Sequence, residues 1–138
     1  MVVDYSMTFT QMTAAGKYIW SDIYINSKQF PLTGTGKVAF EPKLFHFDRN
    51  ISYENAIKEM DKDGFRPAKI EELLAYGTIL LPERDLKHPI IALGSVIKVN
   101  GLPCAAYIQL CGFSSRGILL RQIKDDLHAN NLCLGVRK

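Results

Sequence analysis

Three cysteines, Cys104, Cys111 and Cys133, are the side chains of this 138-residue chain best suited to nucleophilic or metal chemistry. A zinc site requires cysteines or histidines paired at short spacing, whereas Cys104 and Cys111 are seven residues apart and the three histidines are scattered. An odd number of cysteines in a chain of this length does not predict a disulfide framework. We expect buried thiols in a reducing compartment, with no metal and no cofactor. A Cys–His nucleophile stays open, because such partners meet only in the fold.

Carboxylates form three clusters in the sequence, and such clusters could act in acid–base catalysis or bind a cation. Two clusters, Glu71-Glu72 and Asp61/Asp63, fall on predicted helices, and we expect them on solvated faces. The third, Asp125-Asp126, falls in a predicted loop. A calcium loop needs more oxygen ligands at regular spacing than this loop offers, so we interpret the third cluster as ordinary loop polarity.

A glycine-rich segment, Gly34-Thr35-Gly36-Lys37, is similar to the end of a phosphate-binding loop. Such a loop requires an earlier glycine at the position where Pro31 stands, and then Ser or Thr and a helix after the lysine. Here Val38 follows the lysine and a strand is predicted next. We therefore interpret the segment as a turn.

Composition narrows the class of protein. Hydrophobic residues make up 47% and charged residues 22%, which is typical of one globular domain with a substantial core. The net charge of +3 is too small to indicate nucleic-acid binding. No apolar run approaches the ~18 residues of a membrane span, and the first residues lack the pattern of a signal peptide. We expect no nucleic-acid partner and no membrane insertion.

The predicted elements change in type along the chain. Alternating side chains predict strands over residues 5–10 and 43–48. Residue types that favour strands predict two more over residues 17–26 and 37–40, with a hairpin turn at 26–29. Two amphipathic helices follow. Ser52 is suited to cap the first and Gly64 to end it, and the second is predicted over about residues 68–76, ending at Gly77.

Strands return after the helices, over residues 89–99, 102–110, 118–123 and 132–136. The dipeptide Asn100-Gly101 predicts a tight hairpin between the first two of them. Because strands, two helices and strands follow in that order, the predicted class is α+β with an antiparallel sheet.

The strand near residue 119 presents an unusual outer face. Because strand side chains alternate, Ile118 and Leu120 lie on one side and Gly117, Leu119 and Arg121 on the other. If the first pair faces the core, Leu119 is an apolar residue on the surface. The flanking segments add aromatic and small polar side chains, namely Phe113, Ser114, Ser115, His128, Asn130 and Asn131. This mixture suits ligand recognition, and an ordinary sheet edge with one exposed leucine is the alternative that spacing leaves open.

Three segments in the last two-thirds of the chain resemble one known family. Residues 66–77, RPAKIEELLAYG, resemble its helix motif; residues 89–95, PIIALGS, resemble its central strand; and residues 132–138, LCLGVRK, resemble its closing strand. The family is the C-type-lectin-fold variable proteins of diversity-generating retroelements, which microbes and their viruses carry. Its fold is similar to that of the formylglycine-generating enzymes.

The resemblance implies a fold and a site. Residues 46–138 would form a C-type-lectin-like domain, with two helices on a twisted antiparallel sheet, and residues 1–45 a β-rich extension packed on the core. In such systems a reverse transcriptase copies a template repeat with errors at adenines, and the copy replaces the 3′ end of the gene. The variable region would span about residues 105–134. By position, its ligand-binding residues would be Gly117, Leu119, Arg121, Asp125, His128, Asn130 and Asn131, with Phe113, Ser114 and Ser115 beside them.

The function that the resemblance implies is non-enzymatic binding of an unknown ligand, which we expect to be a protein. Location in the cytoplasm or on a virus particle fits the missing signal peptide. Residues 1–45 match no motif of the family and could form an added subdomain or an oligomerisation element, so a homo-oligomer stays open. Two alternatives also stay open: an enzyme of the formylglycine-generating type that uses Cys104 and Cys111, and a lectin-like binder of fixed specificity.

Overall fold

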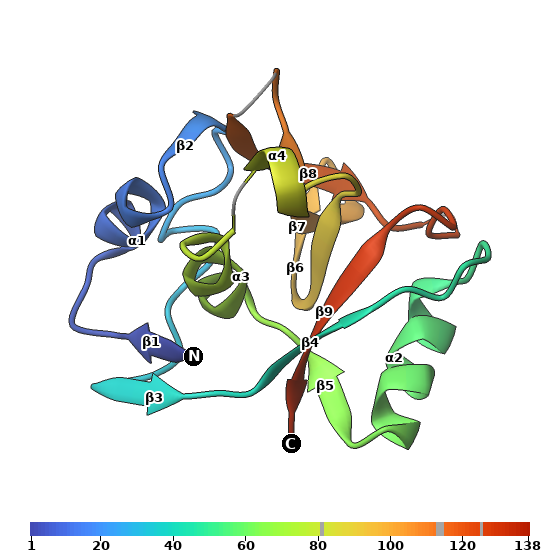
Figure 1. The fold of residues 1–138 in the computed structure, drawn as a ribbon. Coiled ribbons are helices and arrows are strands. Elements are labelled where there is room, and N and C mark those ends of the chain that lie inside the picture. Colours follow the sequence, from blue (N-terminus) through green and yellow to red (C-terminus); the bar gives the residue numbers. More distant parts are fainter. Residues whose placement is uncertain (81, 113–114, 125) are drawn as a thin grey trace.

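A seven-stranded mixed sheet is the centre of the fold (Figure 1). The computed structural model describes residues 1–80, 82–112, 115–124 and 126–138, without the side chains of Pro82 and Glu83. The strands lie in the order β2 (Tyr18–Ser21), β8 (Arg116–Gln122), β7 (Leu102–Leu110), β6 (Ile90–Val99), β9 (Leu132–Arg137) and β4 (Pro42–Phe45), and β5 (Phe65–Pro67) also pairs with β9.

Two pairings of this sheet are parallel, so the expectation of an antiparallel sheet was wrong. Strand β2 runs parallel to β8, and β9 runs parallel to β6, whereas the other pairs are antiparallel. Parallel neighbours require long connections, and both of these pairs are joined through intervening elements. Alternation along a strand does not specify the direction of its partner. The predicted α+β class is confirmed.

Helices cover both faces of the sheet. The described residues form α1 (Phe9–Ala15), α2 (Tyr53–Lys62), α3 (Ile70–Gly77) and the short α4 (Pro82–Asp85). Figure 1 places α1 and α3 side by side, with α2 at the other end of the molecule beside β5. A separate ribbon joins β1 (Val2–Asp4) to β3 (Lys37–Ala39). Within the described ranges, none of the helices combines the length and apolarity needed to cross a membrane.

The core has two parts, one on each face of the sheet. The larger cluster joins α1 and α3 to the face that carries Ile90, Ile108 and Ile118. The smaller cluster joins α2 to the opposite face, which carries Ile91 and Ala105. Neighbouring residues of β6 therefore belong to different clusters, as expected for a strand buried on both sides.

Local signals placed several elements correctly. Ser52 caps α2, because its hydroxyl accepts a hydrogen bond from Asn55 N at 3.2 Å, and Gly64 has a φ of +84° just beyond the end of the helix. Asn100 and Gly101 both have positive φ, as a type I′ hairpin between β6 and β7 requires. Strand β7 spans the predicted residues 102–110.

The first 45 residues differ from the prediction. The segment predicted as a strand over residues 5–10 instead leads into α1, which begins with a capping box: Thr8 Oγ1 accepts from Gln11 N at 3.1 Å, and Gln11 Oε1 accepts from Thr8 N at 2.8 Å. Residues 26–29 do turn, since Phe30 N donates to Asn26 O at 2.9 Å, but no hairpin follows. The expected β-rich extension thus contains a helix, and its strands β2 and β4 belong to the large sheet.

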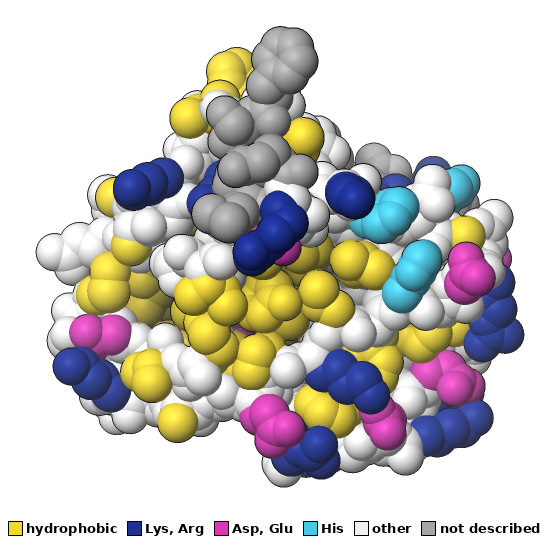
Figure 2. Space-filling model, in the orientation of Figure 1, with side chains coloured by type: hydrophobic (Ala, Val, Ile, Leu, Met, Phe, Trp, Pro, Cys, Tyr) yellow, Lys and Arg dark blue, Asp and Glu magenta, His cyan; other side chains and the backbone are white. Residues whose placement is uncertain are grey.

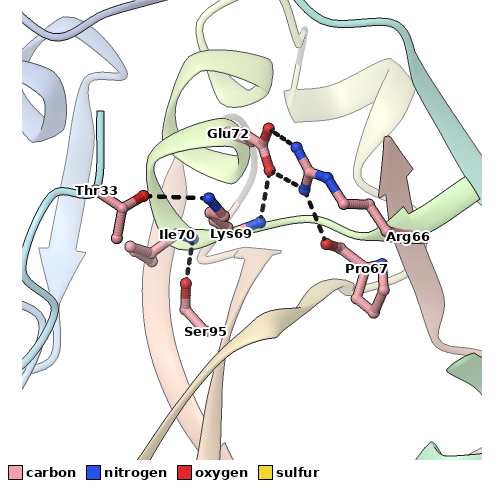
Figure 3. Close-up of polar contacts among 7 residues, drawn as sticks. All are labelled: Thr33, Arg66, Pro67, Lys69, Ile70, Glu72 and Ser95. Carbon is pink, nitrogen blue, oxygen red and sulfur yellow. Dashed lines mark hydrogen bonds and ion pairs between the residues drawn. The ribbon is translucent and has the colours of Figure 1, made fainter. Parts of the chain in front are cut away.

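Glu71 and Glu72 are buried, so the expectation that they lie on a solvated helix face was wrong. Glu71 is 1% exposed and Glu72 is 5% exposed. Glu72 accepts two hydrogen bonds from the Arg66 guanidinium, at 2.8 and 2.7 Å, and one from Lys69 N at 2.8 Å (Figure 3). The α3 amide of Ile70 donates to Ser95 Oγ at 2.9 Å, which ties α3 to the bulge of β6. Side chains from distant elements therefore stabilise the start of α3.

Candidate functional site

The outer face of β8 has the alternation that the sequence predicts. Ile118 is 0% exposed, and Leu120 packs against the same large cluster. On the opposite face Leu119 pairs across the ladder with Tyr107, and both are partly buried. The Arg121 guanidinium lies 5.7 Å from the centroid of the Tyr107 ring, which is within cation–π range. Leu119 and Arg121 thus lie side by side on one face of β8, and the opposite face of this strand packs against the core.

Trp20 from β2 extends this face, although the sequence analysis did not include it in the site. Trp20 pairs with Gly117 and is 64% exposed. Its Cβ lies 3.4 Å from the position that a Cβ on Gly117 would occupy, so its side chain leaves the sheet on the same side. Gln109, the β7 partner of Gly117, completes the set. We call Trp20, Tyr107, Gln109, Leu119 and Arg121 the β8 surface.

Electrostatics at the β8 surface favour a neutral phenol beside a cation. Burial raises the pKa of Tyr107, and the charges of Cys111 and Asp22 raise it too, whereas Arg121 lowers it. The guanidinium therefore interacts with an uncharged aromatic ring. The β8 surface therefore offers a ligand one cationic hydrogen-bond donor, the guanidinium, surrounded by aromatic and aliphatic side chains.

Gly117 is buried between its neighbours and presents no side chain to a ligand. A Cβ at this position would lie 2.7 Å from Cys111 Sγ, which is closer than real Cβ contacts allow. Any side chain at residue 117 must therefore displace Cys111. Ser115, another predicted residue, is partly buried, and its carbonyl oxygen accepts a hydrogen bond from Cys111 N at 2.7 Å.

The Gly117→Ala variant is expected to lose about 1–2 kcal/mol of unfolding free energy, because the added methyl overpacks against Cys111. Combining it with Cys111→Ala should restore most of that loss, since the obstructing sulfur is removed. Urea denaturation of the two single variants and the double variant measures the coupling. Equal losses in the single and double variants would show that Cys111 does not limit the space at residue 117.

The remaining predicted residues lie in the loop between β8 and β9. His128 and Asn130 are exposed, and Asn130 N donates to His128 Nδ1 at 3.2 Å. Asn131 is 6% exposed, and its Nδ2 has no hydrogen-bond partner among the residues that the structure describes. The loop is attached to the segment before α2, because Ala129 N donates to Asn50 Oδ1 at 3.0 Å. Two residues of the loop therefore face solvent, and the third belongs to the interior.

The fold separates the predicted residues into the β8 surface and this loop. Ile123 and Leu127 are both buried in the smaller cluster, against which Tyr107 also packs, so the two groups flank one apolar cluster. No hydrogen bond or ring contact joins the two groups within the described part of the chain. Phe113, Ser114 and Asp125 lie outside the described residues.

Cys104 and Cys111, the cysteines named for the enzyme alternative, are free thiols that do not lie together. Cys104 lies near the start of β7 and Cys111 directly after its last residue, so the two are on the order of 20 Å apart along extended chain, whereas a disulfide requires Cα atoms within about 7 Å. Cys133 is buried, and burial raises its pKa to about 12, which keeps it a thiol. In the described ranges, no three His, Cys, Asp or Glu side chains are grouped so that they could hold a metal ion.

Any assignment of function to this chain rests on its own sequence and geometry. Comparison with known proteins found no matching family model, no matching curated protein and no matching solved structure.

Proposed function

We propose that this chain is a non-enzymatic binding protein that recognises a protein ligand through the β8 surface and the exposed loop residues His128 and Asn130. We further propose that it is a C-type-lectin-like variable protein of a diversity-generating retroelement. The observation that carries the proposal is the position of Leu119 and Arg121. Both project from a strand whose alternate residues, Ile118 and Leu120, are held in the core. Side chains can therefore change at 119 and 121 while the scaffold stays the same.

The chemistry of the β8 surface supports recognition of a protein. Trp, Tyr and Arg are the residue types most enriched among binding hot spots, and Trp20, Tyr107 and Arg121 lie on this one face. Trp20 offers a large exposed apolar area. Two more exposed apolar residues, Ile19 and Ile23, belong to the same segment of the chain. Aromatic anchors beside polar groups favour a protein ligand over a small charged one.

The motif residues that suggest the family have structural roles in this chain, which supports the proposed scaffold. Arg66 and Glu72, from the helix motif, join β5 to α3 through two hydrogen bonds. The central-strand motif supplies the bulge whose Ser95 hydroxyl binds the first turn of α3. The closing-strand motif is β9, which pairs with β4, β5 and β6.

Sequencing the end of the gene across its source population tests the proposal. From about codon 105 to the stop, we expect substitutions confined to adenine positions of a nearby repeat, beside a reverse-transcriptase gene. Codons 119, 121, 128 and 130 should vary, whereas codons 118, 120 and 127 should not, because those residues are packed in the core. An invariant 3′ end without a repeat would contradict the retroelement proposal and favour a binder of fixed specificity.

A further inference from the structure

Two histidines from distant parts of the sequence lie beside each other in the fold. The ring centroids of His46 and His88 are 5.7 Å apart, and the ring planes are inclined by 32°. His46 directly follows β4 and His88 precedes β6, and β9 pairs with both of these strands. Leu44 and Ile90, two residues away from the histidines, both pack in the larger cluster, so alternation places the two imidazoles on the same side of the sheet. Figure 2 shows histidine side chains grouped on one side of the molecule.

A backbone carbonyl fixes the tautomer of His46. Its Nε2 lies 2.9 Å from the carbonyl oxygen of Ala129. Because a carbonyl oxygen can only accept a hydrogen bond, Nε2 carries the proton, and Nδ1 of the neutral ring keeps a lone pair. Histidines that bind metals have the same arrangement, with one ring nitrogen on the metal and the other donating to a carbonyl or carboxylate. His46 therefore has an oriented ring whose second nitrogen is free to act as a ligand.

His88 is positioned to supply a second nitrogen. Within the part of the chain that the structure describes, its contact is the His46 ring, and neither of its ring nitrogens forms a hydrogen bond. A metal ion lies about 2.0–2.1 Å from an imidazole nitrogen, so two imidazoles on one ion have ring centroids roughly 5–6 Å apart. The observed separation of 5.7 Å falls within that range. His46 is exposed and His88 is half-buried, so water can reach the space between the rings.

We propose that His46 and His88 bind one divalent transition-metal cation, whose coordination is completed by water. Imidazole is a good ligand for Ni²⁺, Cu²⁺ and Zn²⁺, whereas Mg²⁺ and Ca²⁺ prefer oxygen. The described residues group no third His, Cys, Asp or Glu with this pair, so the site is open and binds more weakly than a structural zinc site. Because His46 also holds Ala129, which lies between His128 and Asn130, a bound cation restrains that loop. The site uses no residue of the β8 surface, and metal binding does not depend on the proposed function.

Calorimetric titration of the untagged chain with nickel chloride tests the site. We expect a single Ni²⁺ to bind, and His46→Ala and His88→Ala should each weaken binding by about tenfold or more, because two nitrogens on one ion act together. His128→Ala removes the exposed histidine outside the pair and should leave the affinity unchanged. Cys111→Ala, which removes a partly accessible thiol, should leave it unchanged too. Circular dichroism of each variant checks that its fold is retained.

Hydrogen exchange at the Ala129 amide provides a second readout. This amide donates to Asn50 Oδ1 at 3.0 Å, and restraining His46 should slow its exchange. We expect Ni²⁺ to slow exchange in the wild-type chain but not in His88→Ala, a substitution that leaves both hydrogen bonds of Ala129 in place. Magnesium chloride should have no effect. Undetectable binding of Ni²⁺ at millimolar concentration, or equal weakening by His128→Ala and His88→Ala, would overturn the proposal.

Discussion

Replacing Arg66 with methionine is expected to lower the free energy of unfolding by about 3 kcal/mol. Arg66 donates two hydrogen bonds to Glu72, whose side chain is only 7% exposed. Removal of the guanidinium leaves that carboxylate buried with the Lys69 amide as its remaining donor. The Arg66 side chain itself is 36% exposed, so water can partly replace it, and we expect the lower end of the range for buried pairs. Urea denaturation followed by circular dichroism measures the change.

Two further variants separate loss of the ion pair from loss of packing. Adding Glu72→Gln to Arg66→Met removes the unpaired charge and should recover part of the stability. Lys62→Met removes one partner of the exposed Glu59–Lys62 pair and should cost about 0.5 kcal/mol or less. If Arg66→Met were no more destabilising than Lys62→Met, the burial of Glu72 would not have the energetic role argued from its contacts.

Ile118→Ala and Leu119→Ala are expected to differ strongly, although the residues are adjacent. Ile118 is fully buried in the larger cluster, and truncating it should cost about 2–5 kcal/mol. Leu119 lies on the other face and is only partly buried, so its truncation should cost about 1 kcal/mol or less. Denaturant unfolding of both variants under one condition gives the comparison. Similar losses would place Leu119 in the core and remove the basis of the proposed β8 surface.

This pair also bears on function. If a ligand is identified, Leu119→Ala combined with Arg121→Ala should weaken its binding while the melting temperature stays nearly unchanged. Neither side chain is part of the two core clusters formed by the described residues, so their loss leaves the packing of β8 intact. Trp20→Ala is expected to act in the same way, because Trp20 is largely exposed on the same face.

Several features could be predicted because their causes are local. Ser52 and Gly64 set the limits of α2 through their own backbone and side-chain preferences. Asn100-Gly101 requires no distant partner to turn the chain, and alternation alone assigns Ile118 and Leu119 to opposite faces. The candidate site on β8 could therefore be predicted from the sequence.

Other features depend on partners far away in the chain. Thr8 and Gln11 start a helix where alternation predicted a strand, since each satisfies a backbone amide of the other and α1 can then pack beside α3. Trp20 joins the β8 surface through a parallel pairing across about a hundred residues, which no local pattern encodes.

The two glutamates of α3 show most clearly which features are local and which depend on tertiary contacts. Residue order correctly placed Glu71 and Glu72 in the first turn of a helix, where negative charge is favourable. Their burial follows from contacts that the helix cannot make alone. Arg66 from β5 binds Glu72, whereas Glu71 is covered by the β1–α1 region. Local preferences define where elements begin and which face is apolar, whereas long-range packing defines which polar group is buried and whether it finds a partner.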